Sequence, residues 1–141
     1  MGKITEVGFL GNEPKYMSEG AAGADLSAKK MYTIQPNTQV MVDTGTKVAL
    51  PKNTVGFLTP RSSLCNKNGL RLVNSVGILD EDYRGNIKFC YRNEGSEVIV
   101  IGEGERIGQM VVVPYIKAVF TSVETLDITT RGVGGFGSTG E

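Results

Sequence analysis

Three acidic residues stand next to one another in this chain, directly after a short apolar run. Asp80, Glu81 and Asp82 are followed by Tyr83 and then, two positions later, by Gly85, which places the acids in a turn between two strands. Neighbouring carboxylates repel and shift one another's pKa values, so such a cluster is a candidate for a catalytic base or for a metal held through water. On spacing alone, the alternative is a solvated acidic turn.

The absence of histidine from the 141-residue sequence narrows the chemistry. Imidazole is the usual general base near neutral pH, so a carboxylate, with or without a metal ion, becomes the leading candidate here. No Ser-His or Cys-His pair is available to activate a nucleophile either. The two cysteines, Cys65 and Cys90, match no metal-binding spacing and are interpreted as buried free thiols.

Glycine dominates the stretch 131–140, where it occupies five of the ten positions. Glycines let the backbone wrap closely around a ligand, and consecutive N–H groups in such turns form an anion site. Arg131 adds a charged fork suited to phosphate, and Phe136 offers a face on which a base could stack for about 1–3 kcal/mol. The pattern predicts a flexible arm that closes over a nucleotide; the alternative is a disordered tail.

A second candidate anion site begins at Arg61, which is followed by Ser62 and Ser63. The two hydroxyls and Gly69 suit the start and the end of a short helix, and a helix N-terminus binds phosphate well. The alternative is ordinary helix capping. Asp25, where it enters a strand, is interpreted on its own as a turn former.

Short apolar runs between turn signals predict β-strands along the whole chain. They cover residues 7–10, 32–34, 40–42, 46–50, 55–59, 87–91, 98–101 and 110–113. Apart from the short segment after Arg61, no stretch has helical periodicity, which indicates an all-β barrel, sandwich or jelly roll. Without an internal repeat or a linker, the chain is predicted to form one domain, which it leaves at about Thr129.

Composition argues against several classes of function. The 15 basic and 15 acidic residues balance, whereas a nucleic-acid-binding protein usually has a basic excess. No apolar stretch has the length of a signal peptide or of a membrane span. We therefore expect a soluble, intracellular protein with neither nucleic acid nor membrane as a partner.

Five segments taken together strongly resemble the five motifs of the trimeric dUTPases, in order and near that family's spacing. They are residues 23–26, 60–64, 74–85 and 104–109 and the glycine-rich arm. The third and the fifth motifs are highly specific. The departures are small: Ala24 stands where the family often has a bulkier residue, and Ser63 where it often has glycine.

The resemblance implies a fold, an assembly and a reaction. Residues 1–128 would form a jelly-roll-like, distorted β-barrel with one short helix, and residues 129–141 a flexible arm. Three chains would form a homotrimer with its active sites between subunits, each closed by an arm from a neighbour. The enzyme, a dUTP diphosphatase, would use Mg²⁺ to hydrolyse dUTP to dUMP and pyrophosphate, limiting uracil in DNA and supplying dUMP for dTMP synthesis. It would act in the cytoplasm, or in the nucleus in a eukaryotic or viral setting.

The same resemblance assigns roles around the third motif. Asp80 would orient and deprotonate the water that attacks the α-phosphorus. The ring of Tyr83 would pack under the deoxyribose and leave no room for a 2′-hydroxyl. Uracil would be recognised by the side chain of Asn74 and by backbone groups of Gly77, Ile78 and Leu79.

The other motifs would hold the triphosphate and the metal. Asp25 would contact Mg²⁺ through water, while the phosphates themselves grip the ion. Arg61 and Arg106 would pair largely with acids at subunit interfaces. The substrate contacts implied outside the third motif are Arg61, Ser62, the backbone N–H of Ser63, Gln109, and in the arm Arg131, Gly137, Ser138 and Thr139 near the γ-phosphate, with Phe136 stacked on uracil.

Two alternatives remain on the sequence. The related dCTP deaminase shares the jelly roll and a similar Arg-Ser-Ser-Leu segment, but it needs a catalytic glutamate in the motif where this chain has Asp80. Proteins of this family also act as nucleotide-controlled regulators, so a regulatory protein partner would be an addition to the enzyme activity. Release of ammonia from dCTP would reveal the deaminase. A pull-down that changes with a nonhydrolysable dUTP analogue would reveal a regulatory partner.

Overall fold

The computed structural model describes residues 4–137, apart from the side chain of Cys65. Within this range the chain forms eleven strands and one 3₁₀ helix. The strands are β1 (Gly8–Gly11), β2 (Ala24–Ser27), β3 (Tyr32–Ile34), β4 (Gln39–Asp43), β5 (Thr46–Ala49), β6 (Thr54–Thr59), β7 (Leu70–Leu72), β8 (Gly77–Leu79), β9 (Lys88–Asn93), β10 (Ile99–Ile101) and β11 (Arg106–Pro114), and the helix is η1 (Ser62–Asn66). The predicted all-β, jelly-roll-like class is confirmed.

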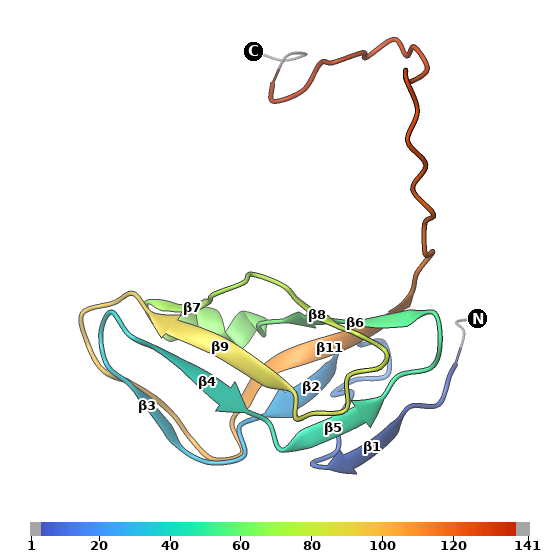
Figure 1. Cartoon of the computed structure of the whole chain (residues 1–141). Coiled ribbons are helices and arrows are strands. Elements are labelled where there is room, and N and C mark those ends of the chain that lie inside the picture. Colours follow the sequence, from blue (N-terminus) through green and yellow to red (C-terminus); the bar gives the residue numbers. More distant parts are fainter. Residues whose placement is uncertain (1–3, 138–141) are drawn as a thin grey trace.

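Antiparallel pairing joins the strands into small sheets that surround one interior (Figure 1). The largest sheet has the order β2-β11-β6-β8, and a second has the order β4-β9-β7. Two further antiparallel pairs, β1-β5 and β10-β3, complete the barrel, and each joins strands that are not consecutive in the sequence. The predicted strands lie close to their expected positions. Strands β2 and β8 were implied only by the strands expected beside Asp25 and Asp80, and β7 was not predicted, because all three are short and interrupted by polar residues or glycine.

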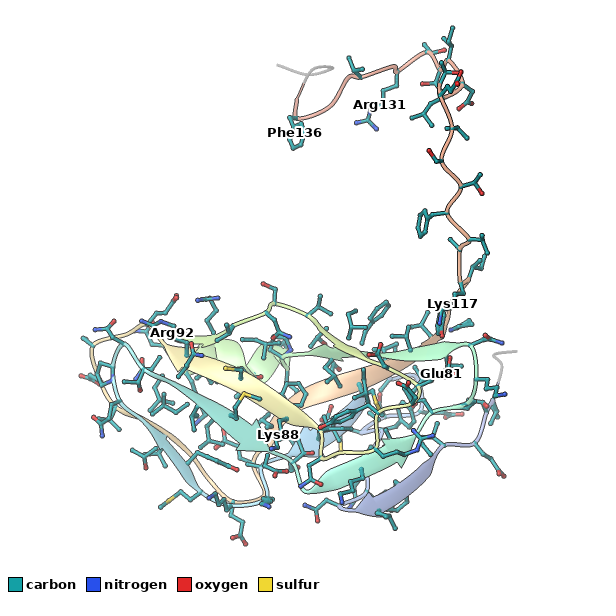
Figure 2. All side chains as sticks on the ribbon, in the orientation of Figure 1. Glu81, Lys88, Arg92, Lys117, Arg131 and Phe136 are labelled. Atoms are coloured by element: carbon teal, nitrogen blue, oxygen red, sulfur yellow. The ribbon has the colours of Figure 1, made fainter. Side chains whose placement is uncertain are left out.

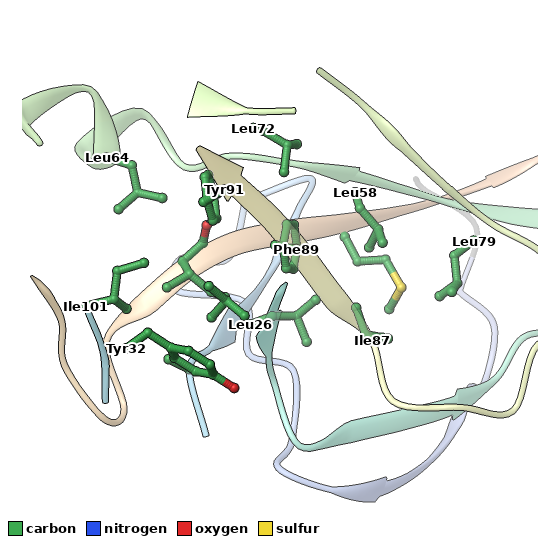
Figure 3. Packing of buried hydrophobic residues seen from close by; sticks show 14 of the residues in the cluster. Leu26, Tyr32, Leu58, Leu64, Leu72, Leu79, Ile87, Phe89, Tyr91 and Ile101 are labelled. Atoms are coloured by element: carbon green, nitrogen blue, oxygen red, sulfur yellow. The ribbon is translucent and has the colours of Figure 1, made fainter. Parts of the chain in front are cut away.

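Alternation along β9 shows how the interior is filled. Phe89, Tyr91 and Asn93 point inward and are at most 1% exposed, while the residues between them face outward. The rings of Phe89 and Tyr91 stack with centroids 6.2 Å apart (Figure 3). The hydroxyl of Tyr91 donates a hydrogen bond to the buried carbonyl of Ile107. Full burial of one such side chain stabilises the fold by about 1.5–3 kcal/mol.

The one helix in the described part of the chain differs from the prediction. It is a 3₁₀ helix of five residues, and Arg61 occupies its N-cap with an extended backbone and no side-chain capping bond. Gly69 does adopt a positive φ of 91°, but in the turn that follows, beyond the C-cap residue Lys67. The expected serine-capped helix N-terminus is therefore wrong, and Ser62 and Ser63 lie exposed beside Arg61 instead.

The C-terminal segment leaves the barrel where β11 ends at Pro114 and then rises away from it (Figure 1). Its apolar side chains are open to solvent in this single chain: Ile116 and Phe120 are each 94% exposed and Ile128 is 98% exposed. The boundary expected at residue 129 lies inside this extended segment, and it stays a prediction about which part acts as the arm.

Candidate active site

A cleft of about 330 Å³ lies between β8, the loop that follows it and β9. All the candidates from the third motif line it, namely Asn74, Gly77, Ile78, Leu79, Asp80 and Tyr83. Apolar side chains of β9 and its neighbours form the rest of the wall, including Met41, Leu72 and Phe89. The fold thus brings this group of predicted residues together around a hollow of suitable size for a small ligand.

Strand β8 is the edge strand of its sheet, and this position explains the character of the cleft. One side of β8 pairs with β6, where Ile78 stands opposite Phe57. Among the described residues no strand pairs with its other side, so that edge presents free N–H and C=O groups. Leu79 is buried and anchors the strand to the core, whereas Ile78 is 59% exposed. A flat, polar base could therefore meet a backbone edge here.

The loop after β8 holds Asp80 and Tyr83 at the mouth of the cleft. Asp80 is exposed, and its carbonyl accepts a hydrogen bond from the backbone N–H of Tyr83 at 3.1 Å. The Tyr83 hydroxyl donates to the carbonyl of Asn86 at 2.9 Å, so the ring folds back over the loop. A Cβ on Gly85 would come within 2.4 Å of that hydroxyl oxygen, which explains the glycine at this position.

Glu81, the middle acid of this turn, is held by hydrogen bonds from two other parts of the chain. The pKa of Glu81 is lowered rather than raised, because its carboxylate accepts hydrogen bonds from the Tyr115 hydroxyl and from the backbone N–H of Asn53. The same bond from the phenol raises the pKa of Tyr115. Hydrogen bonding to the charged form outweighs the opposing effect of desolvation at this residue.

A second group of predicted residues gathers around a buried carboxylate. Asp25 lies in β2 rather than in a turn, which corrects its interpretation as a turn former, and only 9% of it is exposed. Its Oδ2 atom forms ion pairs with Arg61 Nε at 3.0 Å and with Arg106 Nη1 at 3.3 Å. The pairing expected for both arginines is thus made within the chain itself. Arg61 also donates to the Oγ of Ser63 at 2.7 Å.

Gln109 adjoins this group on β11. It stands opposite Asp25 in the sheet, and its side-chain amide donates to Thr59 Oγ1 at 3.2 Å. A Cβ on Gly23 would lie 2.4 Å from the amide oxygen of Gln109, so a larger residue there would require the Gln109 side chain to move. The first, second and fourth motifs therefore meet as one polar cluster.

The arm forms a third, separate group. Arg131 and Phe136 are exposed and lie far from the barrel (Figure 2). Arg131 donates to the carbonyl of Gly134 at 2.8 Å, which makes a local turn. Gly137 is exposed, and Ser138 and Thr139 lie outside the described residues. Neither the cleft nor the arginine–aspartate cluster shares a lining residue with the arm.

The side chains that the structure describes do not form a metal site on their own. Between residues 4 and 137 no group of three acidic, histidine or cysteine side chains converges on one point. Asp25 is the metal-contact candidate that the sequence suggested, and two arginines already bind its Oδ2. Two positive charges on a carboxylate disfavour a directly bound cation, so this residue fits only a contact through water, with most ligands coming from phosphate.

Several residues that shape the site were not predicted from the sequence to do so. Asn86 Nδ2 donates to both carboxylate oxygens of Asp43, at 3.1 and 3.0 Å, and so fixes the far end of the loop that carries Tyr83. Glu81 does the same at the near end. Cys90 lines the cleft and is half-buried, not buried as expected. These contacts join positions far apart in the chain, which periodicity and local motifs do not reveal.

Comparison with known proteins assigns the family. The sequence model of the dUTPase family matches residues 11–140. A deoxyuridine 5'-triphosphate nucleotidohydrolase of Cutibacterium acnes is 46% identical over 128 residues, which are 90% of this chain and 84% of that protein. One from Desulfitobacterium hafniense is 47% identical over 130 residues, covering 90% of this chain and 86% of its own. The chain belongs to the dUTPase family, as the five motifs predicted.

Solved structures match the fold at lower identity. A mutant of the Staphylococcus bacteriophage 80alpha dUTPase with dUpNHpp has a TM-score of 0.91 and 23% identity, and the match covers 98% of this chain and all of that one. A mutant dUTPase from phage phi11 of S. aureus, described with a structural Mg(II) ion, has a TM-score of 0.81 and 20% identity and is matched over 88% of this chain. In the part of the chain that the structure covers, no helix has the length and apolar character needed to span a membrane.

Proposed function

We propose that this protein hydrolyses dUTP to dUMP and pyrophosphate, with Asp80 as the general base. One observation carries the proposal: Asp80 shares the cleft between β8 and β9 with Asn74 and Tyr83. Membership of the dUTPase family supports the same activity, and the curated relatives named above carry the name of that activity. The family assignment favours this reaction over dCTP deamination.

Recognition of the nucleoside would take place along the edge of β8. The free backbone edge and the amide of Asn74 would pair with uracil, and the sheet behind them would leave no space for a thymine methyl. The half-exposed ring of Tyr83 would pack under the deoxyribose. Because this ring is fixed through its hydroxyl to Asn86 at 2.9 Å, it could exclude a 2′-hydroxyl by position alone.

The chemical step would be an attack by water on the α-phosphorus. Asp80 would accept a proton from that water as its oxygen bonds to phosphorus. The bond from the α-phosphorus to the oxygen that bridges to the β-phosphate would break, and pyrophosphate would leave with that oxygen. The product, dUMP, would keep the oxygen supplied by water.

The triphosphate would be held by the polar cluster and by the arm. Ser62, the backbone N–H of Ser63 and Gln109 are its proposed contacts on the barrel, with Arg61 held in place by Asp25. In the arm, Arg131, Gly137, Ser138 and Thr139 would approach the γ-phosphate, while Phe136 would stack on uracil. Mg²⁺, when bound, would neutralise the phosphate charge and fix the triphosphate for in-line attack.

The assembly that completes the site would be a homotrimer. The exposed apolar side chains of residues 116–128 support an interface, since soluble monomers rarely expose such a row. The arm of one chain lies far from its own cleft, so an arm supplied by a neighbour would bring the groups together (Figure 2). Light scattering of the purified protein would test the trimer. A location in the cytoplasm, and any regulatory partner, stay predictions.

A nucleotide panel tests the proposed reaction. Pyrophosphate release would be measured with dUTP, dTTP, UTP and dCTP, each with Mg²⁺ and with EDTA. We expect rapid release from dUTP with Mg²⁺, and a preference over dTTP of at least about 10–200-fold, the range for one methyl group in a pocket. Ammonia released from dCTP would contradict the proposed reaction. Full activity in EDTA would contradict the proposed requirement for Mg²⁺.

A further inference from the structure

The loop between β8 and β9 is bonded within itself and is joined to the rest of the barrel at its two ends. Inside the loop, Arg84 Nη1 donates to the carbonyl of Glu81 at 2.6 Å and to that of Tyr83 at 3.2 Å. Asp80 itself is exposed, and within the described residues no side-chain hydrogen bond or ion pair holds its carboxylate. Its position must therefore be set by its neighbours.

Glu81, the next residue, ties the end of this loop nearer to Asp80 to the barrel, while Asn86 ties the far end through Asp43. Its Oε1 atom accepts a hydrogen bond from the hydroxyl of Tyr115 at 2.5 Å and another from the backbone N–H of Asn53 at 3.1 Å. The partners come from two different elements: Asn53 lies in the turn before β6, and Tyr115 directly follows the last residue of β11. In Figure 2 Glu81 lies near Lys117, where the C-terminal segment leaves the barrel.

The two partners are also bonded to each other, which makes the arrangement stiff. The backbone N–H of Tyr115 donates to the carbonyl of Asn53 at 3.0 Å. Asn53 sits at a positive φ of 65°, a conformation that asparagine tolerates, and Thr54 closes its turn onto Pro51 through both its N–H and its hydroxyl. Glu81 is thus held by a small closed set of hydrogen bonds rather than by one mobile side chain.

We propose that Glu81 is a positioning residue, which sets the place of Asp80 by anchoring its loop to Tyr115 and Asn53. The inference rests on the proposed role of Asp80 as the base. A carboxylate that accepts both an O–H and an N–H at short range restrains the backbone of its own residue, and Asp80 is joined to that backbone by one peptide bond. Because misplacement of a reacting group by about 1 Å can cost about 10²-fold in rate, such an anchor matters for turnover.

The state of charge fits a permanent anchor over the neutral range. The pKa of Glu81 is lowered by the bond from Tyr115, with Lys117 and Lys52 adding a smaller electrostatic effect, and the pKa of Tyr115 is raised. The lowered pKa of Glu81 and the raised pKa of Tyr115 both favour a charged carboxylate and a protonated phenol at neutral pH. The anchor is lost only on acidification below the ordinary range of a glutamate, or at strongly alkaline pH.

Turnover of the full chain with dUTP and Mg²⁺ provides the test. We expect Glu81→Ala and Tyr115→Phe each to lower kcat about tenfold while KM changes less than about twofold, because the base is displaced and the binding groups are not. Glu81→Gln keeps an acceptor oxygen and should retain most of the rate. Combining Glu81→Ala with Tyr115→Phe should cost little more than the larger single change, since both remove one anchor.

Matched controls separate positioning from general damage. Glu97→Ala and Tyr16→Phe alter exposed side chains that make no side-chain hydrogen bond or ion pair within residues 4–137, and they should leave kcat unchanged. Thermal unfolding of every variant would show whether the barrel stays folded. In an Asp80→Asn background, Glu81→Ala should have no further effect on the residual rate.

The outcomes distinguish this inference from the function on which it rests. Normal turnover in Asp80→Asn would overturn the assignment of the base and the anchor together. An inactive Asp80→Asn with a normal kcat in Glu81→Ala and Tyr115→Phe would overturn the anchor alone. So would a rise in KM at constant kcat, or equal damage from Glu81→Gln and Glu81→Ala.

Discussion

The cleft beside β8 and the C-terminal arm carry complementary parts of the same predicted site, yet they are built in opposite ways. The cleft is walled by side chains that belong to the core, such as Leu79 and Phe89 at 5% and 1% exposure. The arm displays its functional groups in open space, with Phe136 fully exposed. The groups proposed to select the base are thus already in place in the single chain, whereas those proposed to enclose the phosphates would need a ligand or a neighbouring chain to position them.

The largest effect is expected inside the cleft. Asp80→Asn keeps the shape of the side chain but removes its ability to accept a proton, so turnover should fall about 10²–10⁴-fold. Binding of a nonhydrolysable dUTP analogue, measured by calorimetry, should be nearly unchanged. Near-normal turnover would mean that another group is the base and that the cleft serves recognition only.

Removal of the arm should have the next largest effect on turnover and little effect on stability. A chain that ends after Thr130 loses Arg131 and Phe136 with the rest of the arm, and closure of this kind is worth several kcal/mol of barrier, or about 10²-fold or more in rate. The unfolding temperature should stay nearly the same, because residues 131–137, the described part of the arm, include no buried side chain. A large drop in that temperature would show that the arm supports the barrel.

Mixing two inactive chains tests where the arm acts. The truncated chain still has Asp80, and an Asp80→Asn chain still has its arm. If the arm reaches a neighbour's cleft, some mixed trimers combine an intact arm with an intact base and activity returns. After subunit exchange has been confirmed, a failure to recover activity would count against an arm that crosses between chains.

Sugar selection should respond to Tyr83 with a smaller change. Tyr83→Ala removes the ring that is fixed above the loop by its bond to Asn86, so UTP should become a measurable substrate and the ratio of dUTP to UTP rates should fall about tenfold or more. The ratio is the informative quantity. Rates that fall in parallel for the two nucleotides would show that the ring does not read the 2′ position.

The smallest effect on catalysis is expected deep in the barrel. Tyr91→Phe removes the buried hydrogen bond to the carbonyl of Ile107, and leaving that acceptor unpaired should cost about 1–3 kcal/mol of unfolding free energy. Denaturant unfolding would measure this loss, while kcat for the folded fraction should not change. A fall in kcat as large as that for Glu81→Ala would show that the core, and not a local anchor, positions the site.

The fold class and the family could be predicted from the residues alone. Short apolar runs separated by turns indicated an all-β fold, because the side-chain period of a strand is local and can be read in a few residues. The five motifs identified the family, since glycines, arginines and acids in fixed order are a property of the chain. The absence of histidine favoured a carboxylate as the general base.

Contacts between distant parts of the chain fix how these residues are held. No local pattern indicated that Asp25 would be buried between Arg61 and Arg106, or that Glu81 would bind Tyr115, because these bonds join residues brought together only by strand pairing. The helix after Arg61 is a short 3₁₀ turn without a side-chain cap, and Leu64 within it packs into the core, which the local capping signals did not reveal. Residue types set which reactions are available, and long-range packing set which side chains are fixed in place to perform them.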